Sequence, residues 1–268
     1  MKFNISLLIA ALRTYGRNLK GRKFEPEIPF LKYILNKGDN CLHIGASDAR
    51  HSYVMSGLIG NGQIYAFEPS SYSYSHLVLM AKMHRLNNIH TYNYAVSDKP
   101  GKVCLVTPEK STGHAGRSFA FITSLNNSNK DRTDIKSSSS TVEEVKGVTV
   151  DDFVAENRLQ SVDFVRCDTE GSEMLILNGA KNTIEKYKPC LLIEIHSEAL
   201  KDVFNSSASE VSGRLFSLGY RMFREDGGNI REVKVVDETE NWKDYFLIHP
   251  DRISRLPEGP FRDQLSQQ

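Results

Sequence analysis

The stretch that decides the fold is residues 41–69, CLHIGASDARHSYVMSGLIGNGQIYAFEP. A largely apolar run meets a small-residue turn, Gly-Ala-Ser, at residues 45–47, and a helix-compatible segment continues to the Asn-Gly turn at 61–62. A second apolar run, residues 64–67, ends at Glu68. This order predicts a strand, a tight turn, a helix and a second, parallel strand.

Glu68 is the feature that suggests a ligand. It lies about twenty residues past the glycine turn, where an acid at the tip of the second strand binds the ribose of a nucleotide. Pro69 follows at once, so the strand ends with the carboxylate at its tip. The alternative is an exposed acid that caps the following helix. We favour the first interpretation and expect an adenosine-type cofactor.

The composition is that of an ordinary globular protein. The chain has 268 residues, 40% hydrophobic and 25% charged, which suits one α/β domain with extensions. A net charge of +1 gives no reason to expect nucleic acid as a partner, since a nucleic-acid-binding surface usually brings a basic excess. Four cysteines stand far apart without C-x-x-C spacing, so we expect buried thiols in a reducing cytosol and no disulfide or zinc site: Cys41, Cys104, Cys167 and Cys190.

The first 23 residues contain no acid and several bases: Lys2, Arg13, Arg17, Lys20, Arg22 and Lys23. The apolar run at 5–12 is far too short to span a bilayer, and no signal-peptide cleavage site follows it. We favour a surface helix that packs its Leu7, Leu8 and Leu12 side against the domain. The alternative is a basic amphipathic segment that contacts an anionic membrane. We expect a cytoplasmic protein, located at the inner membrane surface under the second interpretation.

Strands and helices alternate along most of the chain. The pattern predicts strands at residues 40–44, 63–67, 89–96, 162–167, 190–195, 220–224 and 245–248. It predicts helices at 30–35, 70–87, 172–187 and 209–218, and a strand leading into a helix at 148–153, which Asp151 would cap. Five strands alternating with helices, then a strand pair, predict an α/β fold. Its sheet would be mostly parallel, with helices on both faces and an antiparallel edge.

One long segment, residues 107–147, interrupts this pattern with Ser, Asn, Thr and charged residues. A run of this length inside a domain is usually a lid, a binding loop or a disordered insert. We therefore expect three parts. They are a basic helical extension at 1–36, a main domain at 37–250 that contains the insert, and a tail at 251–268.

Acidic residues follow the predicted strand 162–167. In open α/β sheets, ligands bind beyond the carboxyl ends of the strands, where Asp168 and Glu170 lie. Arg166 is on the same strand face as Asp168 and is placed to neutralise these acids. The alternative is a solvated first turn of a helix, where acids are favoured. We assign Glu173 to that role, and Asp168 and Glu170 to function.

A second polar pair, Glu194 and His196, ends the strand 190–195 and shares one face by the two-residue period of a strand. Glu194 is costly to bury unless it has a partner. His196 is a candidate general base, because the ordinary pKa of histidine lies near neutrality. It is equally compatible with a structural histidine whose ring nitrogens are both satisfied.

In this order, the pieces resemble the FkbM family of S-adenosylmethionine-dependent methyltransferases. The matching segments are GD at 38–39, LHIGAS at 42–47, YAFEP at 65–69, NYAVSD at 93–98, VTVDD at 148–152, VDFVRCDTEGSE at 162–173, LNGA at 177–180 and KPCLLIEI at 188–195. The resemblance covers about residues 37–200. It implies a class I methyltransferase fold, which is Rossmann-like, and S-adenosyl-L-methionine as the cofactor. It also implies methyl transfer to a hydroxyl of a sugar, a glycoconjugate or a secondary metabolite.

The resemblance further implies roles for the residues at the strand tips. The cofactor-binding candidates are His43, Gly45, Ala46, Ser47, Glu68, Ala95, Val96 and Ser97. The turn at 45–47 would face the methionine part of the cofactor, Glu68 the ribose, and residues 95–97 the adenine. The catalytic candidates are Asp168 or His196 as the base, with Glu170 orienting the acceptor. No metal is expected, because nothing in the spacing of the acids demands one.

Two positions depart from the family pattern: His43 replaces an acid before the glycine turn, and Ala49 replaces a second glycine. They suggest an alternative, a non-catalytic protein that binds a nucleoside or a partner on the same fold. A nicotinamide-dependent oxidoreductase needs G-x-G-x-x-G, whereas residues 45–50 are GASDAR. As partners we expect a small-molecule or glycan acceptor and no nucleic acid. The sequence leaves the oligomeric state open.

Overall fold

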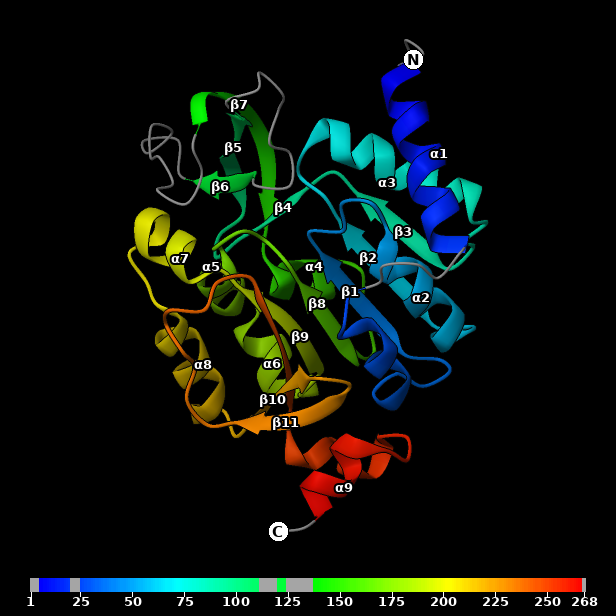
Figure 1. The fold of residues 1–268 in the computed structure, drawn as a ribbon, viewed down its shortest axis with the longest axis vertical. Coiled ribbons are helices and arrows are strands. Elements are labelled where there is room, and N and C mark those ends of the chain that lie inside the picture. Colours follow the sequence, from blue (N-terminus) through cyan, green and yellow to red (C-terminus); the bar gives the residue numbers. More distant parts are fainter. Residues whose placement is uncertain (1–4, 20–24, 111–119, 124–136, 267–268) are drawn as a thin grey trace.

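The computed structural model describes residues 5–19, 25–110, 120–123 and 137–266. Its centre is an eight-stranded sheet (Figure 1) in the order β11-β10-β12-β9-β8-β1-β2-β3. Five neighbouring strands are parallel: β9 (Cys190–Ile195), β8 (Phe164–Cys167), β1 (Asn40–Ile44), β2 (Gln63–Phe67) and β3 (Ile89–Tyr92). The other three pair antiparallel with their neighbours, so β12 (Lys243–Ile248) and β11 (Asn229–Val233) run opposite to these five and β10 (Arg221–Asp226) runs in their direction. The mostly parallel α/β sheet is confirmed, and β11 is an addition that the sequence pattern does not predict.

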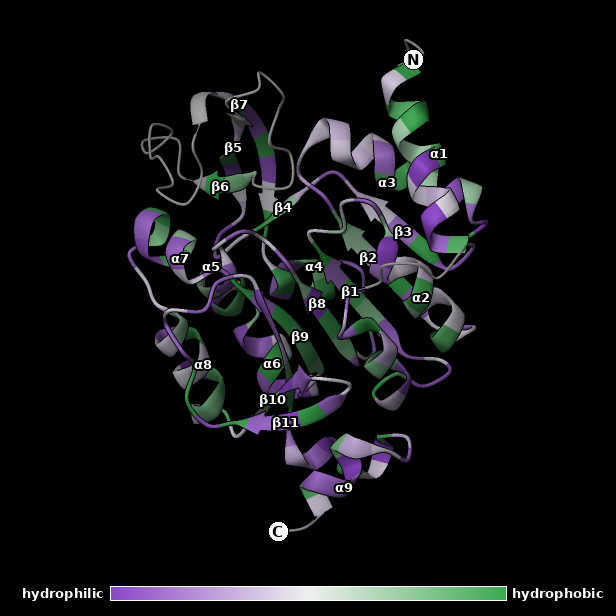
Figure 2. Ribbon diagram, in the orientation of Figure 1, coloured by the Kyte–Doolittle hydropathy of each residue, from purple (hydrophilic) through white to green (hydrophobic). Residues whose placement is uncertain are grey.

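Helices cover both faces of this sheet. One face packs against α4 (Val150–Glu156), α5 (Glu173–Gly179), α6 (Lys181–Tyr187) and α8 (Ala208–Ser217). The other packs against η1 (Ile28–Tyr33), α2 (Arg50–Ile59), α3 (Ser71–Met83) and α9 (Pro260–Ser266). Side chains alternate between the two layers, so Leu42 and Ile44 of β1 lie in one core and Cys41 in the other. Apolar residues accordingly dominate the central parallel strands in Figure 2.

Three further helices lie around this body. The helix α1 (Ile5–Leu19) packs on α3, α7 (Ser197–Phe204) follows β9, and η4 (Pro250–Arg255) follows β12. Within the described ranges, no helix has the length and apolar character needed to cross a membrane. All four cysteines are free and buried, which confirms the prediction of buried thiols.

A second sheet of four strands has the order β4-β7-β5-β6 (Figure 1). Its strands are β4 (Ala95–Val96), β5 (Gly101–Lys110), β6 (Phe121–Thr123) and β7 (Ser137–Val148). The expectation of an irregular segment at 107–147 is wrong where β5, β6 and β7 pair; residues 111–119 and 124–136 lie outside the described residues. Val145 is buried between exposed Glu144 and Lys146, so one face of β7 is solvated. The polar residues on that face make the strand hard to recognise from the sequence.

Close backbone packing divides two predicted elements. The predicted strand 89–96 separates into β3 and β4, which belong to different sheets. Between them, the side-chain amide of Asn93 donates to the carbonyls of Glu68 and Pro69, both at 2.9 Å. The predicted helix 172–187 separates into α5 and α6 at Gly179, where a Cβ would lie 2.1 Å from the carbonyl oxygen of Ser97.

Asp151 caps a different helix from the one expected. The N-cap of α4 is Thr149, whose hydroxyl accepts a hydrogen bond from the Asp152 N–H at 2.9 Å. The Asp151 carboxylate accepts from the N–H groups of Asn182 and Thr183, at 3.0 and 2.8 Å. It therefore caps the first turn of α6 and links α4 to α6. The dipole of α6 also favours a negative charge at this end of the helix.

The chain changes direction in the main sheet between β1 and β8. The strands β2 and β3 lie on one side of β1, whereas β8 and β9 lie on the other. The carboxyl ends of β1 and β8 thus form a topological switch point, where α/β sheets bind ligands. Gly45 is required here, because its φ is +79° and a Cβ would lie 1.8 Å from the carbonyl oxygen of Asp168. The predicted cofactor turn and the predicted acceptor-side acid are therefore direct neighbours.

Candidate active site

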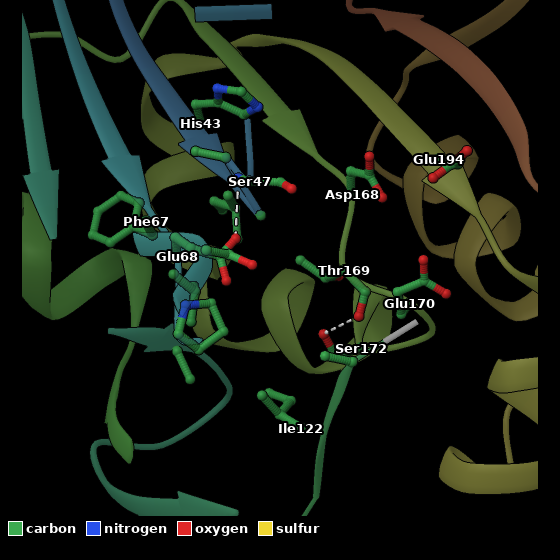
Figure 3. Close-up of a pocket in the computed structure, with 18 of the residues that line it drawn as sticks. His43, Ser47, Phe67, Glu68, Ile122, Asp168, Thr169, Glu170, Ser172 and Glu194 are labelled. Carbon is green, nitrogen blue, oxygen red and sulfur yellow. Dashed lines mark hydrogen bonds between the residues drawn. The ribbon is translucent and has the colours of Figure 1, made fainter. Parts of the chain in front are cut away.

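A cavity of about 550 Å³ opens at the switch point, a volume in the range of small-molecule sites. Figure 3 shows His43, Ser47, Phe67 and Glu68 on one side of it, and Asp168, Thr169, Glu170 and Glu194 on the other. The structure brings nearly all of the predicted site residues to its wall: His43, Gly45, Ala46, Ser47, Glu68, Ala95, Val96, Asp168, Glu170 and His196. Elements far apart in the sequence therefore build one site.

Ser97 is the predicted cofactor-binding residue that the structure does not bring into the cavity. It is buried, its N–H donates to the carbonyl of Val148 at 2.9 Å, and its hydroxyl donates to Asp98 at 3.2 Å. Its own carbonyl faces Gly179 at the junction of α5 and α6. Ser97 thus joins β4 to the helical layer, while Ala95 and Val96 face the ligand space.

Glu68 holds the turn after β1. Its carboxylate accepts hydrogen bonds from the N–H groups of Ser47 and Ser70, both at 3.0 Å. Burial raises the pKa of Glu68 to about 7, against the lowering effect of these two donors. Glu68 is buried, so the alternative of an exposed helix-capping acid is wrong, although one oxygen does bond the N-cap residue of α3.

The two departures from the family pattern differ in their consequences. Ala49 adopts the left-handed conformation, with φ +61°, so the turn keeps a shape that a glycine would adopt without strain. His43 is buried, with its Nδ1 2.7 Å from the hydroxyl of Ser52. Burial lowers the pKa of His43 well below its ordinary value, and nearby His51 and Arg166 lower it further. Position 43 is therefore neutral and supplies no negative charge to the cavity.

Glu25 is a further carboxylate in the lining of the cavity, and the sequence does not predict it. Glu25 pairs with Arg50 through one oxygen, and its Oε2 has no hydrogen-bond partner within the described part of the chain. Arg50 also bonds Asp48, at 2.9 Å. No local pattern marks Glu25, because it precedes the first predicted helix and reaches the site through tertiary packing alone.

Arg166 is the buried cation beneath the other side of the cavity. Its guanidinium lies 3.2 Å from Asp168 and 2.7 Å from Asp244, so the predicted pairing with Asp168 is confirmed. Burial raises the pKa of Asp168 to about 7; Arg166 opposes this shift and Glu194 adds to it. Asp244 of β12 lies opposite Glu194 in the ladder with β9. No local pattern marks Asp244 in the sequence, because only the register of β12 with β9 brings it to Arg166.

His196 lies between two carboxylates. Its Nε2 is 2.9 Å from Glu194 and its Nδ1 is 3.3 Å from Glu170. The His196 side chain is 1% exposed, whereas the Asp168 side chain is 33% exposed. Trp242 contacts His196 edge to face and lines the cavity with a partly exposed indole. Trp242 is the chain's single tryptophan, and that rarity is the one sequence signal that marks it.

Glu173 is not the solvated helix acid that the sequence predicts. It is fully buried beside Val165 and Ile176. Its Oε1 accepts from the Gly171 N–H at 3.0 Å, and its Oε2 has no hydrogen-bond partner among the residues described. Burial raises the pKa of Glu173 to about 8, so this carboxyl is mostly protonated at neutral pH.

Two sets of side chains in the described ranges come close enough to share one cation. The ligand atoms of Asp168, Glu194 and His196 lie within 4.8 Å of one another, and those of Glu25, Glu27 and His51 do the same. Arg166 already faces Asp168, and His51 faces Glu27 at 3.0 Å. That the chemistry needs no metal stays a prediction.

The strand order and the cavity at the switch point define a class I methyltransferase fold. The methyltransferase FkbM domain family matches residues 43–222, so the chain belongs to this family. This confirms the resemblance found in the sequence. No curated protein sequence matches the chain.

The chain is similar to solved structures at low sequence identity. A methyltransferase FkbM from Methylobacillus flagellatus has a TM-score of 0.50 and 13% identity, over 80% of this chain and 44% of that one. The chain thus spans less than half the length of that relative. A SAM-dependent O-methyltransferase from Thermotoga maritima has a TM-score of 0.44 and 10% identity, over 88% and 71%. Aeropyrum pernix fibrillarin in complex with S-adenosyl-L-methionine has a TM-score of 0.41 and 15% identity, over 90% and 74%.

Proposed function

We propose that the protein is an S-adenosylmethionine-dependent O-methyltransferase that acts on a hydroxyl of a sugar, a glycoconjugate or a secondary metabolite. The observation that carries this proposal is the placement of Glu68 and Asp168 around one cavity at the switch point (Figure 3). Glu68 has the spacing of a ribose-binding acid, and Asp168 has a pKa of about 7 that suits proton transfer near neutral pH. A non-catalytic nucleoside- or partner-binding protein is the alternative.

Each part of the cofactor has a candidate surface in the cavity. Ala95 and Val96, with Phe67, form an apolar wall for the adenine, and ionised Glu68 accepts the ribose hydroxyls. The turn at 45–47 lets the methionine part approach the backbone. Glu25 is the proposed partner of the methionine ammonium group, since one of its oxygens lacks a hydrogen-bond partner in the described structure.

Asp168 is the proposed base. Methyl transfer to oxygen is an in-line displacement, so alignment supplies most of the catalysis and the protein needs only to remove the acceptor's proton. S-adenosylmethionine, when bound, supplies the electrophilic methyl group. Asp168 keeps part of its carboxylate open to the cavity, whereas both ring nitrogens of His196 face carboxylates. His196 therefore positions Glu170, which orients the acceptor hydroxyl.

The acceptor side of the cavity favours a sugar. Trp242 presents a partly exposed indole near Glu170 and Glu194. A pyranose combines hydroxyls at its edge with an apolar face of C–H groups, which suits an aromatic surface flanked by carboxylates. Ala120 and Ile122, both within residues 107–147, line the same cavity. We place part of the acceptor specificity in the 107–147 insert for this reason.

Calorimetric titration with S-adenosylhomocysteine tests the cofactor assignment. We expect the wild-type protein to bind it, and Glu68→Gln to weaken binding about tenfold to hundredfold, because hydrogen bonds to a charged group contribute about 1.5–3 kcal/mol. The ionised carboxylate is the binding form, and the pKa of Glu68 is about 7. Wild-type affinity should therefore rise between about pH 6 and pH 8, and the variant should lose most of this rise.

The same titration separates the three functions. Absence of binding at millimolar S-adenosylhomocysteine would refute the methyltransferase proposal, and binding of a nicotinamide dinucleotide instead would favour an oxidoreductase. Binding alone, without transfer of labelled methyl from S-adenosylmethionine to any of a panel of sugars, polysaccharides and hydroxylated metabolites, would favour the non-catalytic alternative.

Glu25→Gln tests the ammonium partner. We expect it to weaken S-adenosylhomocysteine binding about tenfold, the usual loss for one charge-assisted hydrogen bond, while 5′-methylthioadenosine, which lacks the amino-acid part, binds as before. Asp48→Asn is the matched control, since Asp48 also bonds Arg50 but directs both oxygens to it. The control should change affinity less than about threefold. An equal loss of both ligands in Glu25→Gln would contradict the assignment.

A further inference from the structure

The helix α1 turns its apolar side outward. Four of its large apolar residues are exposed, 68% for Ile5, 45% for Ile9, 54% for Leu12 and 58% for Leu19, while Leu7, Leu8 and Tyr15 are half-buried. Its buried residues are small or polar: Ala11, Thr14 and Asn18. An amphipathic helix on a globular domain normally shows the reverse arrangement. From this reversal we infer that the exposed face of α1 is a binding surface for an anionic lipid membrane.

Helical geometry makes the exposed residues one continuous stripe. Positions 5, 9, 12 and 19 are separated by four, three and seven residues, which places them on one side of a helix with 3.6 residues per turn. Positions 11, 14 and 18 occupy the opposite side, about 150° away. We call the first set, Ile5, Ile9, Leu12 and Leu19, the outer stripe. In Figure 2, α1 lies at the edge of the molecule with hydrophobic residues along it.

Polar contacts hold the inner side of α1. The Asn18 amide lies 3.2 Å from the Nε2 of His84, and the ring of Tyr15 packs against His84 at 4.5 Å. These contacts fix which side faces α3, so the outer stripe cannot turn inward without breaking them. The expected packing of the Leu7, Leu8 and Leu12 side against the domain is therefore wrong for Leu12, which is exposed, whereas Leu7 and Leu8 are half-buried. A large exposed apolar stripe on a folded protein marks a site of interaction.

Charge identifies the partner as an anionic surface. The first 23 residues contain no acid, and the bases within α1, Arg13 and Arg17, are both exposed. A helix with apolar residues on one side and bases beside them lies in the plane of a membrane interface and binds acidic headgroups. A second copy of α1 on the stripe would instead bring four arginines together without any acid to pair with them. This surface is independent of the methyltransferase proposal.

Sedimentation with lipid vesicles tests the inference. The full chain should sediment with vesicles of equal parts phosphatidylcholine and phosphatidylglycerol, and at least about tenfold less with phosphatidylcholine alone or in high salt. The Ile9→Ser/Leu12→Ser double variant should lose at least about tenfold of the partitioning. These side chains are exposed, so the fold should persist, as circular dichroism would verify. Val235→Ser, at an exposed apolar residue far from α1 in the sequence, should sediment like the wild type.

Three outcomes would overturn it. They are failure of the wild type to sediment with the anionic vesicles, equal sedimentation of the double variant, and equal sedimentation with neutral vesicles. Light scattering without lipid measures the oligomeric state and so tests the competing occupant, a second copy of the chain. A dimer that the double variant converts to a monomer would assign the outer stripe to a second copy of the chain.

Discussion

Replacing Asp168 with asparagine is expected to lower kcat about 100-fold to 10,000-fold while affinity for S-adenosylhomocysteine changes less than about threefold. The large loss follows from removal of the general base, whose contribution is usually of that size. The pKa of Asp168 is about 7, so the kcat of the wild type should rise with pH through about 7. The variant should show no such rise. The measurement is transfer of labelled methyl from S-adenosylmethionine to an acceptor that the wild type methylates.

Asp244→Asn is the matched control for this experiment. Asp244 is the other carboxylate on Arg166, at 2.7 Å. It does not belong to the cavity lining that the described residues form. Its removal takes the same charge from Arg166 without touching the acceptor, so kcat should fall by less than about tenfold and keep its pH dependence. If Asp168→Asn retained full turnover, the base would be another group. If both variants lost activity equally, Asp168 would act only through Arg166.

The sequence predicts the parts of the site that local patterning determines. Gly45, Glu68 and Asp168 are each recognisable because they end an apolar run, and parallel strands bring their carboxyl ends to one edge of the sheet. The five parallel strands are predictable for a related reason, since a strand buried on both faces is a nearly continuous apolar run. The sequence therefore predicts these three residues as site residues, and all three line the cavity.

The remaining features depend on contacts between distant segments. Glu25 reaches the cavity from the chain before β1, and the register of β12 with β9 brings Asp244 to Arg166. Ser97 lies outside the cavity, and its carbonyl packs against Gly179. Nothing in the neighbouring sequence of these residues encodes such pairings. Glu173 shows the same limit, because an acid in the first turn of a helix has the same pattern whether it is solvated or buried.

Glu173→Gln is expected to flatten the pH dependence of stability. The folded protein raises the pKa of this carboxyl to about 8 from an ordinary value of 4.5, so it keeps a proton that the unfolded chain releases. The stabilisation is therefore complete below about pH 4.5 and is lost as the pH rises through about 8. Relative to the variant, the wild type should lose on the order of 3 kcal/mol of unfolding free energy between pH 5 and pH 8.

Urea unfolding of both proteins across this pH range measures that difference. The slope is the decisive quantity, because a buried glutamine amide brings its own unpaired N–H groups and so shifts the absolute stability at every pH. Glu185→Gln, at an exposed acid of α6, is the control and should follow the wild-type curve. Parallel curves for wild type and Glu173→Gln would contradict the prediction. They would mean that Glu173 ionises as easily in the fold as in the unfolded chain, and hence that its Oε2 gains a partner in solution.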